Sequence, residues 1–278
     1  MFDKESYKYT RSFSIFNNIV EVNAQYEEFL DELEDFLPSS SSYQTADVVL
    51  YTELKQTHRY LFRTRPHDSL PLPIYVEENE KIKVWQSSTP PFPPFESQKF
   101  KGRYVALHAG AIMDEINQVT LIIGKQGAGK TTLSTKMSND YGYQYLTDET
   151  AIVATGTNYI FPFPRIILPR VQNRGEIVKV KIPAKKIVTN IAEVGGVIKN
   201  IVFLEPTDKT KRVEAEDIDY VSCRHRLFES YQYAGTDLKN SFSTLDLIAK
   251  TAQAKVISYP ENDFQALLSI AGLLKGSD

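Results

Sequence analysis

Cysteine is nearly absent from this chain, which holds a single thiol, Cys223. One cysteine cannot form an intrachain disulfide, and it excludes a metal cluster built from several cysteines. The chain also lacks any stretch close to the ~20 apolar residues of a membrane span. Its first residues, Met1-Phe-Asp-Lys-Glu5, carry neither the basic nor the apolar region of a secretory signal. We therefore expect a protein of the reducing cytoplasm without a membrane partner.

A strong excess of one charge is lacking as well. The 278 residues include 32 Lys or Arg and 35 Asp or Glu, a net charge of −3. The balance is uneven, because residues 1–100 hold 10 basic and 16 acidic side chains, whereas residues 101–278 hold 22 and 19. This distribution argues against general nucleic-acid binding and predicts two parts with different surfaces.

Residues 1–86 have the pattern of a small α+β part. Short apolar runs predict two strands within 7–22 around Asn17-Asn18, and further strands at 46–51, 59–63, 73–76 and 81–85. Asn23 is suited to cap a helix over 24–37. Residues 87–98 follow, with prolines at 90, 91, 93 and 94 that exclude a helix or a central strand. We predict a stiff connector there; a polyproline motif for an aromatic-lined groove is the alternative.

Residues 99–278 alternate between strand-like and helix-like segments, which predicts an α/β domain. The predicted strands are 104–107, 110–113, 119–123, 143–146, 150–154, 159–161, 178–182, 198–204 and 255–259. The predicted helices are 132–139, 222–233, 242–250 and 263–275.

The clearest motif in this domain is Gly124-Lys-Gln-Gly-Ala-Gly-Lys-Thr131, between an apolar strand and a helix. This order is the one that a phosphate-binding P-loop requires. Its glycines let backbone N–H groups point at phosphate oxygens, and the helix N-terminus favours an anion. Lys130 is expected to face solvent until it meets the β- and γ-phosphates, and the Thr131 hydroxyl to bind Mg²⁺. The alternative is a Gly-rich turn that binds nothing.

The nucleotide contacts predicted from this motif are Gly124, Lys125, Gln126, Gly127, Ala128, Gly129, Lys130, Thr131 and Thr132.

Two further residues are candidates for chemistry. Asp148 ends the strand that follows the P-loop helix, and it lies beside the loop if the two strands are neighbours; an acid there can reach Mg²⁺ or an incoming hydroxyl. The alternative for Asp148 is a turn or capping acid. His108 stands where a strand-like run breaks before the P-loop hairpin. A lone histidine is more often a packed, hydrogen-bonded residue than a participant, so both interpretations of His108 stay open.

Taken in order, four segments resemble the HPr serine kinase family. They are Leu107-His-Ala-Gly-Ala111, the P-loop, Tyr145-Leu-Thr-Asp-Glu149 and Phe161-Pro-Phe-Pro-Arg165. The chain is more similar still to kinase-like relatives found with ribosomally made peptides, such as lasso-peptide tailoring kinases. The resemblance covers roughly residues 100–205, and the N-terminal part only in general layout.

The resemblance implies a compact P-loop kinase core of the phosphoenolpyruvate-carboxykinase type that uses Mg-ATP to phosphorylate serine. The first acid of the family's pair falls on Asp148, which implies a general base. The second falls on Glu149, which departs from the family's aspartate and is implied to help hold the metal. His108 would lie beside the phosphates. Arg165 would face the phosphates or a substrate carboxylate, or would only pack.

The second signature of HPr kinases, with a Pro-Gly-Arg loop, is not seen in residues 170–200. Neither HPr as the substrate nor a dephosphorylating activity therefore follows from the resemblance. We predict an ATP-dependent serine kinase that acts on a peptide or small protein, including a lasso-type precursor. A small-metabolite kinase and a nucleotide-binding regulatory module are the alternatives, and a homo-oligomer stays open.

Overall fold

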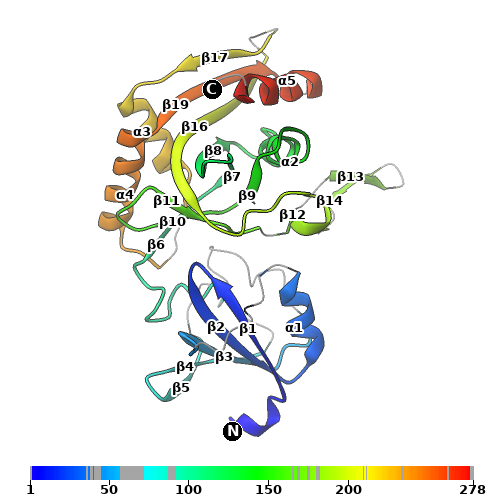
Figure 1. Cartoon of the computed structure of the whole chain (residues 1–278), viewed down its shortest axis with the longest axis vertical. Coiled ribbons are helices and arrows are strands. Elements are labelled where there is room, and N and C mark those ends of the chain that lie inside the picture. The colour runs from blue at the N-terminus through cyan, green and yellow to red at the C-terminus, as the bar shows by residue number, and fades with distance from the viewer. Residues whose placement is uncertain are drawn as a thin grey trace. The chain divides into compact units, whose positions relative to one another are not determined.

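The computed structural model of the chain (Figure 1) describes residues 2–35, 37, 40, 45–56, 72–86, 92–164, 166–167, 170–173, 176–179, 182–208, 210, 212–232, 235–261 and 263–275. These residues form a mixed α/β protein, as the sequence predicts. They divide into two compact units, residues 1–104 with 233–236, and residues 105–232 with 237–278. No helix in these ranges is long and apolar enough to cross a membrane.

The first unit is built on a five-stranded sheet in the order β1-β2-β3-β4-β5. The strands are β1 (Tyr9–Ile15), β2 (Asn18–Ala24), β3 (Val48–Thr52), β4 (Ile74–Glu78) and β5 (Lys81–Val84), and a 3₁₀ turn (Lys4–Ser6) precedes them. β2 and β3 run parallel, whereas the other neighbours run antiparallel. The α1 helix (Glu27–Glu34) buries Phe29, Leu30 and Leu33. The strand predicted at 59–63 lies outside the described residues.

The helix α1 begins later than predicted, because Asn23 belongs to the sheet. Asn23 pairs with Thr10 of β1, and its Oδ1 accepts a hydrogen bond from the Thr10 hydroxyl at 2.6 Å. The pairing continues to Ala24, and the helix follows with Tyr26 at its N-cap and no side-chain capping bond. Pairing between strands therefore outweighs the local capping signal of Asn23.

The described part of the proline-rich segment is packed inside the first unit. Phe92 and Phe95 are fully buried. The Phe95 ring stacks on Phe16 with centroids 6.1 Å apart, and Tyr104 packs against Phe16 at 5.1 Å. Apolar rings placed between prolines thus contribute to the core at residues 92–98, where the sequence predicts a connector.

The second unit contains a ten-stranded sheet with helices on both faces. Its strands are β6 (Tyr104–Leu107), β7 (Ala109–Met113), β8 (Gln118–Gly124), β9 (Gln144–Thr147), β10 (Ala151–Ala154), β11 (Tyr159–Phe161), β16 (Gly196–Thr207), β17 (Glu214–Asp217), β18 (Tyr231–Gln232) and β19 (Gln253–Pro260). Its helices are α2 (Lys130–Tyr141), α3 (Tyr220–Glu229), α4 (Leu238–Thr251) and α5 (Phe264–Lys275), with a 3₁₀ turn at Ala184–Lys186.

Four short strands form two small ladders beside this sheet. β12 (Ile166–Ile167) pairs with β15 (Ile182–Pro183), and β13 (Arg170–Asn173) pairs with β14 (Glu176–Lys179).

The third helix is shifted from its prediction by a cap at one end and a strand at the other. The Asp219 carboxylate accepts a hydrogen bond from the Ser222 backbone N–H at 2.8 Å, so α3 starts at Tyr220. Residues 231–232, predicted to be helical, instead form β18, which pairs with β6. The tertiary partner thus ends the helix earlier than its apolar pattern indicates.

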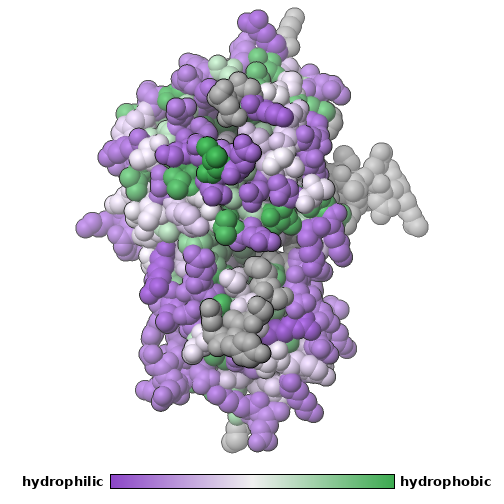
Figure 2. Space-filling model, viewed as in Figure 1, coloured by the Kyte–Doolittle hydropathy of each residue, from purple (hydrophilic) through white to green (hydrophobic). Residues whose placement is uncertain are grey.

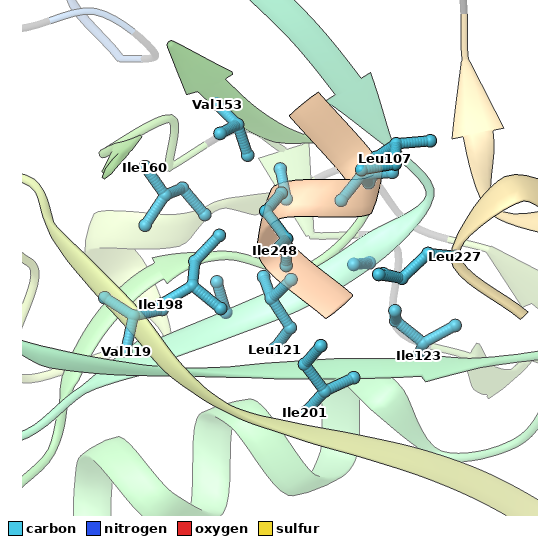
Figure 3. Close-up of a cluster of buried hydrophobic side chains, with 14 of the residues drawn as sticks. Leu107, Val119, Leu121, Ile123, Val153, Ile160, Ile198, Ile201, Leu227 and Ile248 are labelled. Carbon is cyan, nitrogen blue, oxygen red and sulfur yellow. The ribbon is translucent and has the colours of Figure 1, made fainter. Parts of the chain in front are cut away.

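The long strand β16 stands at the centre of the sheet. It runs parallel to β8 on one side and to β19 on the other, and its first residues pair antiparallel with β11. Alternate side chains of β8 and β16 point to opposite faces and are buried on both. One face carries Leu121 and Phe203 against α3 and α4, and the other carries Ile122 and Leu204 against α2 and α5. Figure 3 shows Ile248 of α4 among the side chains of the first face.

The strand β7 lies between the P-loop strand β8 and the strand β9. β8 and β9 are therefore not neighbouring strands, so the condition stated for Asp148 is not met. A tight turn explains it, because the Asp114 carboxylate accepts hydrogen bonds from the backbone N–H groups of Ile116 and Gln118. The turn folds β7 directly onto β8, so β9 pairs with the other edge of β7 and runs parallel to β8.

Hydrophilic residues cover most of the described surface in the view of Figure 2, with hydrophobic residues in small groups between them. The large apolar side chains are gathered instead in the interiors of the two units.

Candidate functional site

The glycine-rich loop joins the end of β8 to the start of α2, as the motif predicts. Gly129 is the N-cap residue of α2 and has a φ of 79°, a conformation that L side chains rarely adopt. A Cβ atom added to Gly129 would lie 2.5 Å from a terminal methyl group of Leu267 on α5. The backbone angle therefore favours glycine at this position, and a Cβ there would force the Leu267 side chain to shift.

Lys130 turns back onto its own loop. Its Nζ donates hydrogen bonds to the backbone oxygens of Gly124 at 2.7 Å and Lys125 at 3.3 Å. The side chain is buried, with 8% of its surface exposed, so the expectation that it faces solvent is wrong. Burial lowers the pKa of the Lys130 ammonium, and the carboxylates of Glu149 and Asp148 oppose this shift. The two carbonyls hold the ammonium group at the end of β8.

Thr131 and Asp148 meet at the start of α2. The Thr131 hydroxyl donates a hydrogen bond to Asp148 Oδ2 at 2.7 Å. Asp148 is 2% exposed and follows the last residue of β9, whereas Glu149 beside it is half-buried. The structure thus brings the hydroxyl of the P-loop together with the acid that the sequence singles out.

The small residue Gly110 explains how this contact spans the intervening strand β7. A Cβ on Gly110 would lie 2.7 Å from the Ser134 hydroxyl oxygen of α2 and 3.6 Å from the Asp148 Cα. The absence of a side chain lets α2 and the residue after β9 both lie close to β7 at this position. Ser134 is fully buried and donates its hydroxyl proton to the Lys130 carbonyl oxygen at 2.8 Å, which keeps the first turn of α2 in place.

His108 stands at the same edge of the sheet, between β6 and β7. The next residue, Ala109, pairs with Ile123 of the P-loop strand. The His108 backbone N–H donates to the Ser230 carbonyl at 2.6 Å, and Nδ1 lies 3.3 Å from Gln232 Nε2. The other end of the Gln232 amide accepts a hydrogen bond from the Thr150 hydroxyl at 3.5 Å. A chain of polar groups thus joins His108 to the segment that follows Asp148.

The remaining predicted contacts differ in exposure. Lys125, Gln126 and Gly127 are exposed at the tip of the loop, Gly124 and Thr132 are half-buried, and Ala128 is buried. Arg165 lies outside the described residues, so its predicted role stays a prediction. Phe163, two residues before it, is buried and donates its backbone N–H to the Leu146 carbonyl of β9 at 2.9 Å.

Comparison with known proteins finds structural neighbours of the chain. No protein-family model matches the chain, and a search of curated proteins finds no match. The chain is similar to the HPr(Ser) kinase/phosphatase from Coxiella burnetii. The similarity covers 62% of this chain and 88% of that one, at 15% identity and a TM-score of 0.28. At so low a TM-score, the geometry around Lys130 and Asp148 is the basis for inferring function.

Two supports of the loop are missed by sequence reasoning. The Tyr259 hydroxyl of β19 donates to the Ala128 carbonyl at 2.7 Å, and burial raises the pKa of Tyr259 to about 12. Leu267 of α5 packs against Gly129. Tyr259 ends a predicted strand and Leu267 lies within a predicted helix, but only the parallel pairing of β16 with β19 carries them to the P-loop.

The side chains at this edge fit a magnesium–phosphate group. The Thr131 hydroxyl and the two carboxylates of Asp148 and Glu149 are the hard oxygen ligands that Mg²⁺ prefers. In the described ranges, no three His, Cys, Asp or Glu side chains gather into a metal cluster of their own. A cation held by Thr131 and one carboxylate would complete its coordination with phosphate oxygens and water, as Mg²⁺ usually does at phosphate sites.

Proposed function

We propose that this chain is an ATP-dependent kinase that transfers the γ-phosphate of ATP to a serine hydroxyl of a peptide or small protein. The observation that carries the proposal is the hydrogen bond of 2.7 Å between the P-loop hydroxyl of Thr131 and the buried carboxylate of Asp148. A glycine-rich anion loop binds phosphate in many proteins, but a buried acid at the loop hydroxyl is suited to chemistry on the γ-phosphate.

The loop and Lys130 would bind the nucleotide. Backbone N–H groups of residues 124–131 contact the phosphates, and Lys130 leaves the Gly124 and Lys125 carbonyls to contact the β- and γ-phosphate oxygens. A bound Mg²⁺ would neutralise charge that develops on these oxygens. Thr131 and Glu149 are the residues that we propose to hold it.

Asp148 would accept the proton of the attacking hydroxyl. A bond forms between the serine oxygen and the γ-phosphorus, while the bond from that phosphorus to the bridging β–γ oxygen breaks and ADP leaves. The serine proton moves to the Asp148 carboxylate. Burial of Asp148 supports this role, because a fixed base in a water-poor site is positioned for the transfer.

We assign His108 a supporting role at the same site. Its link through Gln232 to Thr150 ties the ring to the chain segment just after the acidic pair. We infer that this network orients the residues 148–150 relative to the P-loop.

Acceptor and activity can be tested together. Purified protein is incubated with Mg²⁺ and γ-labelled ATP, alone, with serine-containing peptides and with small hydroxylated metabolites. Transfer to peptide supports the proposal, and transfer only to metabolites would support the metabolite kinase. Tight ATP binding without turnover would favour a regulatory nucleotide-binding module instead.

A lasso-type precursor is the acceptor that we would test first, because the ordered segments from His108 to Phe163 resemble kinases that act with ribosomally made peptides. A threonine-for-serine version of the same peptide separates serine specificity from general hydroxyl transfer. A single buried cysteine is also what a cytoplasmic enzyme would carry, and we propose that location for it.

A further inference from the structure

A cavity of about 440 Å³ lies on the hairpin of β4 and β5 in the first unit, remote in sequence from the P-loop. Val76 and Glu78 of β4 form part of its wall, and Trp85, which directly follows β5, forms another part. Glu96 and Ser97 lie on a turn and form a third part of the wall. A volume of this size is typical of sites that take a small ligand or a few peptide residues.

In the part of the chain that the structure describes, one backbone edge of β5 has no partner strand. Among the described residues, β5 pairs with β4 alone and ends the five-stranded sheet. Lys83 pairs with Val76, so both side chains stand on the face of the hairpin that lines the cavity. Lys81, Lys83 and Val84 are exposed. An exposed edge strand can accept an extended peptide as a further strand through main-chain hydrogen bonds.

Ser97 places a buried polar group at the cavity. It is 2% exposed, and its hydroxyl makes no hydrogen bond with any described residue. Its backbone is fully engaged, because its N–H donates to Pro94 and its carbonyl accepts from Phe100 and Lys101. A buried hydroxyl without a partner destabilises the fold, so a ligand that supplies the missing hydrogen bond binds more tightly.

Two carboxylates give the cavity its charge preference. Glu78 Oε1 accepts the Gln98 backbone N–H at 2.8 Å, which holds the carboxylate against the turn. Its Oε2 lies 4.0 Å from Lys83 Nζ, and Glu96 Oε2 lies 3.5 Å from Lys101 Nζ. Both lysines are more than half exposed, and ion pairs of this kind are weak and readily exchanged. The surrounding sequence is acidic too, with 16 acidic and 10 basic side chains in residues 1–100.

We propose that the β5 edge and this cavity bind an extended peptide segment that carries an arginine or lysine side chain. The aliphatic stem packs against Val76 and the Trp85 ring, and the cationic group meets the carboxylates of Glu78 and Glu96. The peptide backbone pairs with β5. Peptide binding at this site requires no catalysis. Only the idea that the bound peptide is the kinase acceptor, or a segment attached to it, rests on the proposed function.

The single tryptophan of the chain, Trp85, reports binding directly. Full-length protein without nucleotide is titrated with a short blocked peptide in which one arginine is flanked by valine and threonine. We expect a saturable change in Trp85 fluorescence, and no comparable change with the peptide that has glutamate in place of arginine. N-methylation of alternate peptide nitrogens weakens binding if the backbone pairs with β5.

Substitutions in the cavity wall distinguish binding in the cavity from a general attraction between the cationic peptide and an acidic surface. Glu78→Gln and Glu96→Gln each lower the affinity about tenfold, the effect of losing one charge-assisted hydrogen bond. Glu80→Gln is the matched control, because it removes the same charge from the exposed turn of the same hairpin and leaves the affinity within about twofold. Ser97→Ala weakens binding without lowering the unfolding temperature, since it removes a hydroxyl that the fold leaves unpartnered.

Three outcomes of the binding titration would overturn the proposal. One is an equal response to the arginine and glutamate peptides, and another is free arginine binding as tightly as the peptide, which would indicate a small cationic ligand. The third is a fluorescence change with protein concentration alone, which would assign the edge to a second copy of the chain. Phosphate transfer to a peptide that leaves Trp85 unaffected would reject the docking site and keep the kinase. Saturable, arginine-dependent binding without any transfer would keep the docking site and reject the kinase.

Discussion

At the residue scale, the proposed function requires Lys130 to exchange one set of partners for another. Without nucleotide, the carbonyls of Gly124 and Lys125 take its ammonium protons; with nucleotide, phosphate oxygens would replace them. The exchange is favourable because a phosphate carries full negative charge and a carbonyl only a partial one. The two carbonyls hold the ammonium group at the loop, so under the proposed function it would reach the phosphates by a short rearrangement.

Replacing the Lys130 side chain should strongly reduce phosphate transfer. For Lys130→Ala we expect transfer to fall by roughly 10²-fold or more, because a preorganised charge at the γ-phosphate disappears. The measurement is initial-rate transfer from labelled ATP. Lys199→Ala, at an exposed lysine of β16, should retain wild-type rates. Transfer near the wild-type rate by Lys130→Ala would refute the P-loop assignment.

The lowered pKa of Lys130 predicts a proton linkage. Burial disfavours the charged form in the free protein, so part of the population loses this proton as pH rises through the lowered value toward 10.5. ATP favours the ammonium form, so binding should take up protons as the pH approaches the lowered pKa of Lys130 and should weaken as pH rises further. Calorimetry of ATP binding in two buffers of different ionisation enthalpy measures the uptake. The linkage should vanish in Lys130→Met, and its persistence there would assign it to another group.

The stability of the free protein depends on pH in the opposite direction to ATP binding. While the pH is below the lowered pKa of Lys130, both the folded and the unfolded chain carry the charge, and its burial destabilises the fold. The destabilisation is relieved as pH rises from that value to 10.5.

Variants of the acidic pair test the two proposed roles, Asp148 as the general base and Glu149 as a metal ligand. Asp148→Asn should keep ATP affinity and lower transfer by roughly 10²–10⁴, the contribution of a positioned base. Glu149→Gln should show a defect that shrinks as Mg²⁺ is raised, because a weakened metal site refills. Single-turnover transfer across a Mg²⁺ titration measures both. Rescue of Asp148→Asn by metal, but not of Glu149→Gln, would reverse the two roles; wild-type behaviour of both would make the pair structural.

At the element scale, β19 and α5 support the P-loop on the side away from Asp148 and Glu149. β19 contributes the Tyr259 hydroxyl that holds the Ala128 carbonyl, and α5 packs Leu267 against Gly129. β7, between β8 and β9, carries Gly110 where α2 crosses. The loop therefore takes its shape from β19, α5 and β7 as well as from its own glycines.

Two glycines with the same backbone conformation test this bracing. Gly129→Ala and Gly156→Ala both place a Cβ at a positive φ, 79° and 76°, but only the former meets a neighbour, at 2.5 Å from Leu267. We expect Gly129→Ala to reduce the free energy of unfolding by about 1–3 kcal/mol more than Gly156→Ala. Chemical denaturation with ATP titration measures both effects. Leu267→Ala in the Gly129→Ala background should recover part of the ATP affinity, and equal losses in the two single variants would contradict the proposed packing role.

At the scale of the whole molecule, the chain forms two units, and each unit contains two segments that are separate in sequence. The backbone N–H of Gly102 donates to the Gly235 carbonyl at 3.0 Å, and the Thr236 hydroxyl donates to the Tyr104 carbonyl. Residues 233–236 thereby belong with the first unit although both of their flanks lie in the second. A chain cut near residue 99 would keep these two partners but lose the five-stranded sheet of the first unit.

Cys223 reports on the folding of the second unit. The thiol is 1% exposed in the core beneath α3, and burial raises its pKa to about 11. At neutral pH the folded protein should therefore react with a thiol reagent orders of magnitude more slowly than the unfolded chain. Labelling across a urea gradient should follow unfolding cooperatively, and ATP should slow it by stabilising the fold. Rapid labelling in native buffer would show that α3 does not cover the thiol.

Much of the second unit follows from its sequence. The strand–loop–helix order around Gly124–Thr131, the alternation of strands with helices and the place of Asp148 at a strand end are all local patterns, and the structure confirms them as elements. These features follow from local sequence, because the spacing of apolar residues and the positions of glycines fix the backbone conformation over a few residues. Residues 23 and 231–232 depart from their local preferences, since each pairs with a strand distant in sequence.

Only the tertiary structure decided which strands are neighbours and what the site residues contact. The insertion of β7 between β8 and β9, the burial of Lys130 and the support from Tyr259 all depend on partners distant in sequence. The cavity at β5 appears only when β4, β5 and residues 96–97 are assembled. A single sequence records which face each element buries, but not against which partner, because apolar burial has no direction and many pairings satisfy the same pattern.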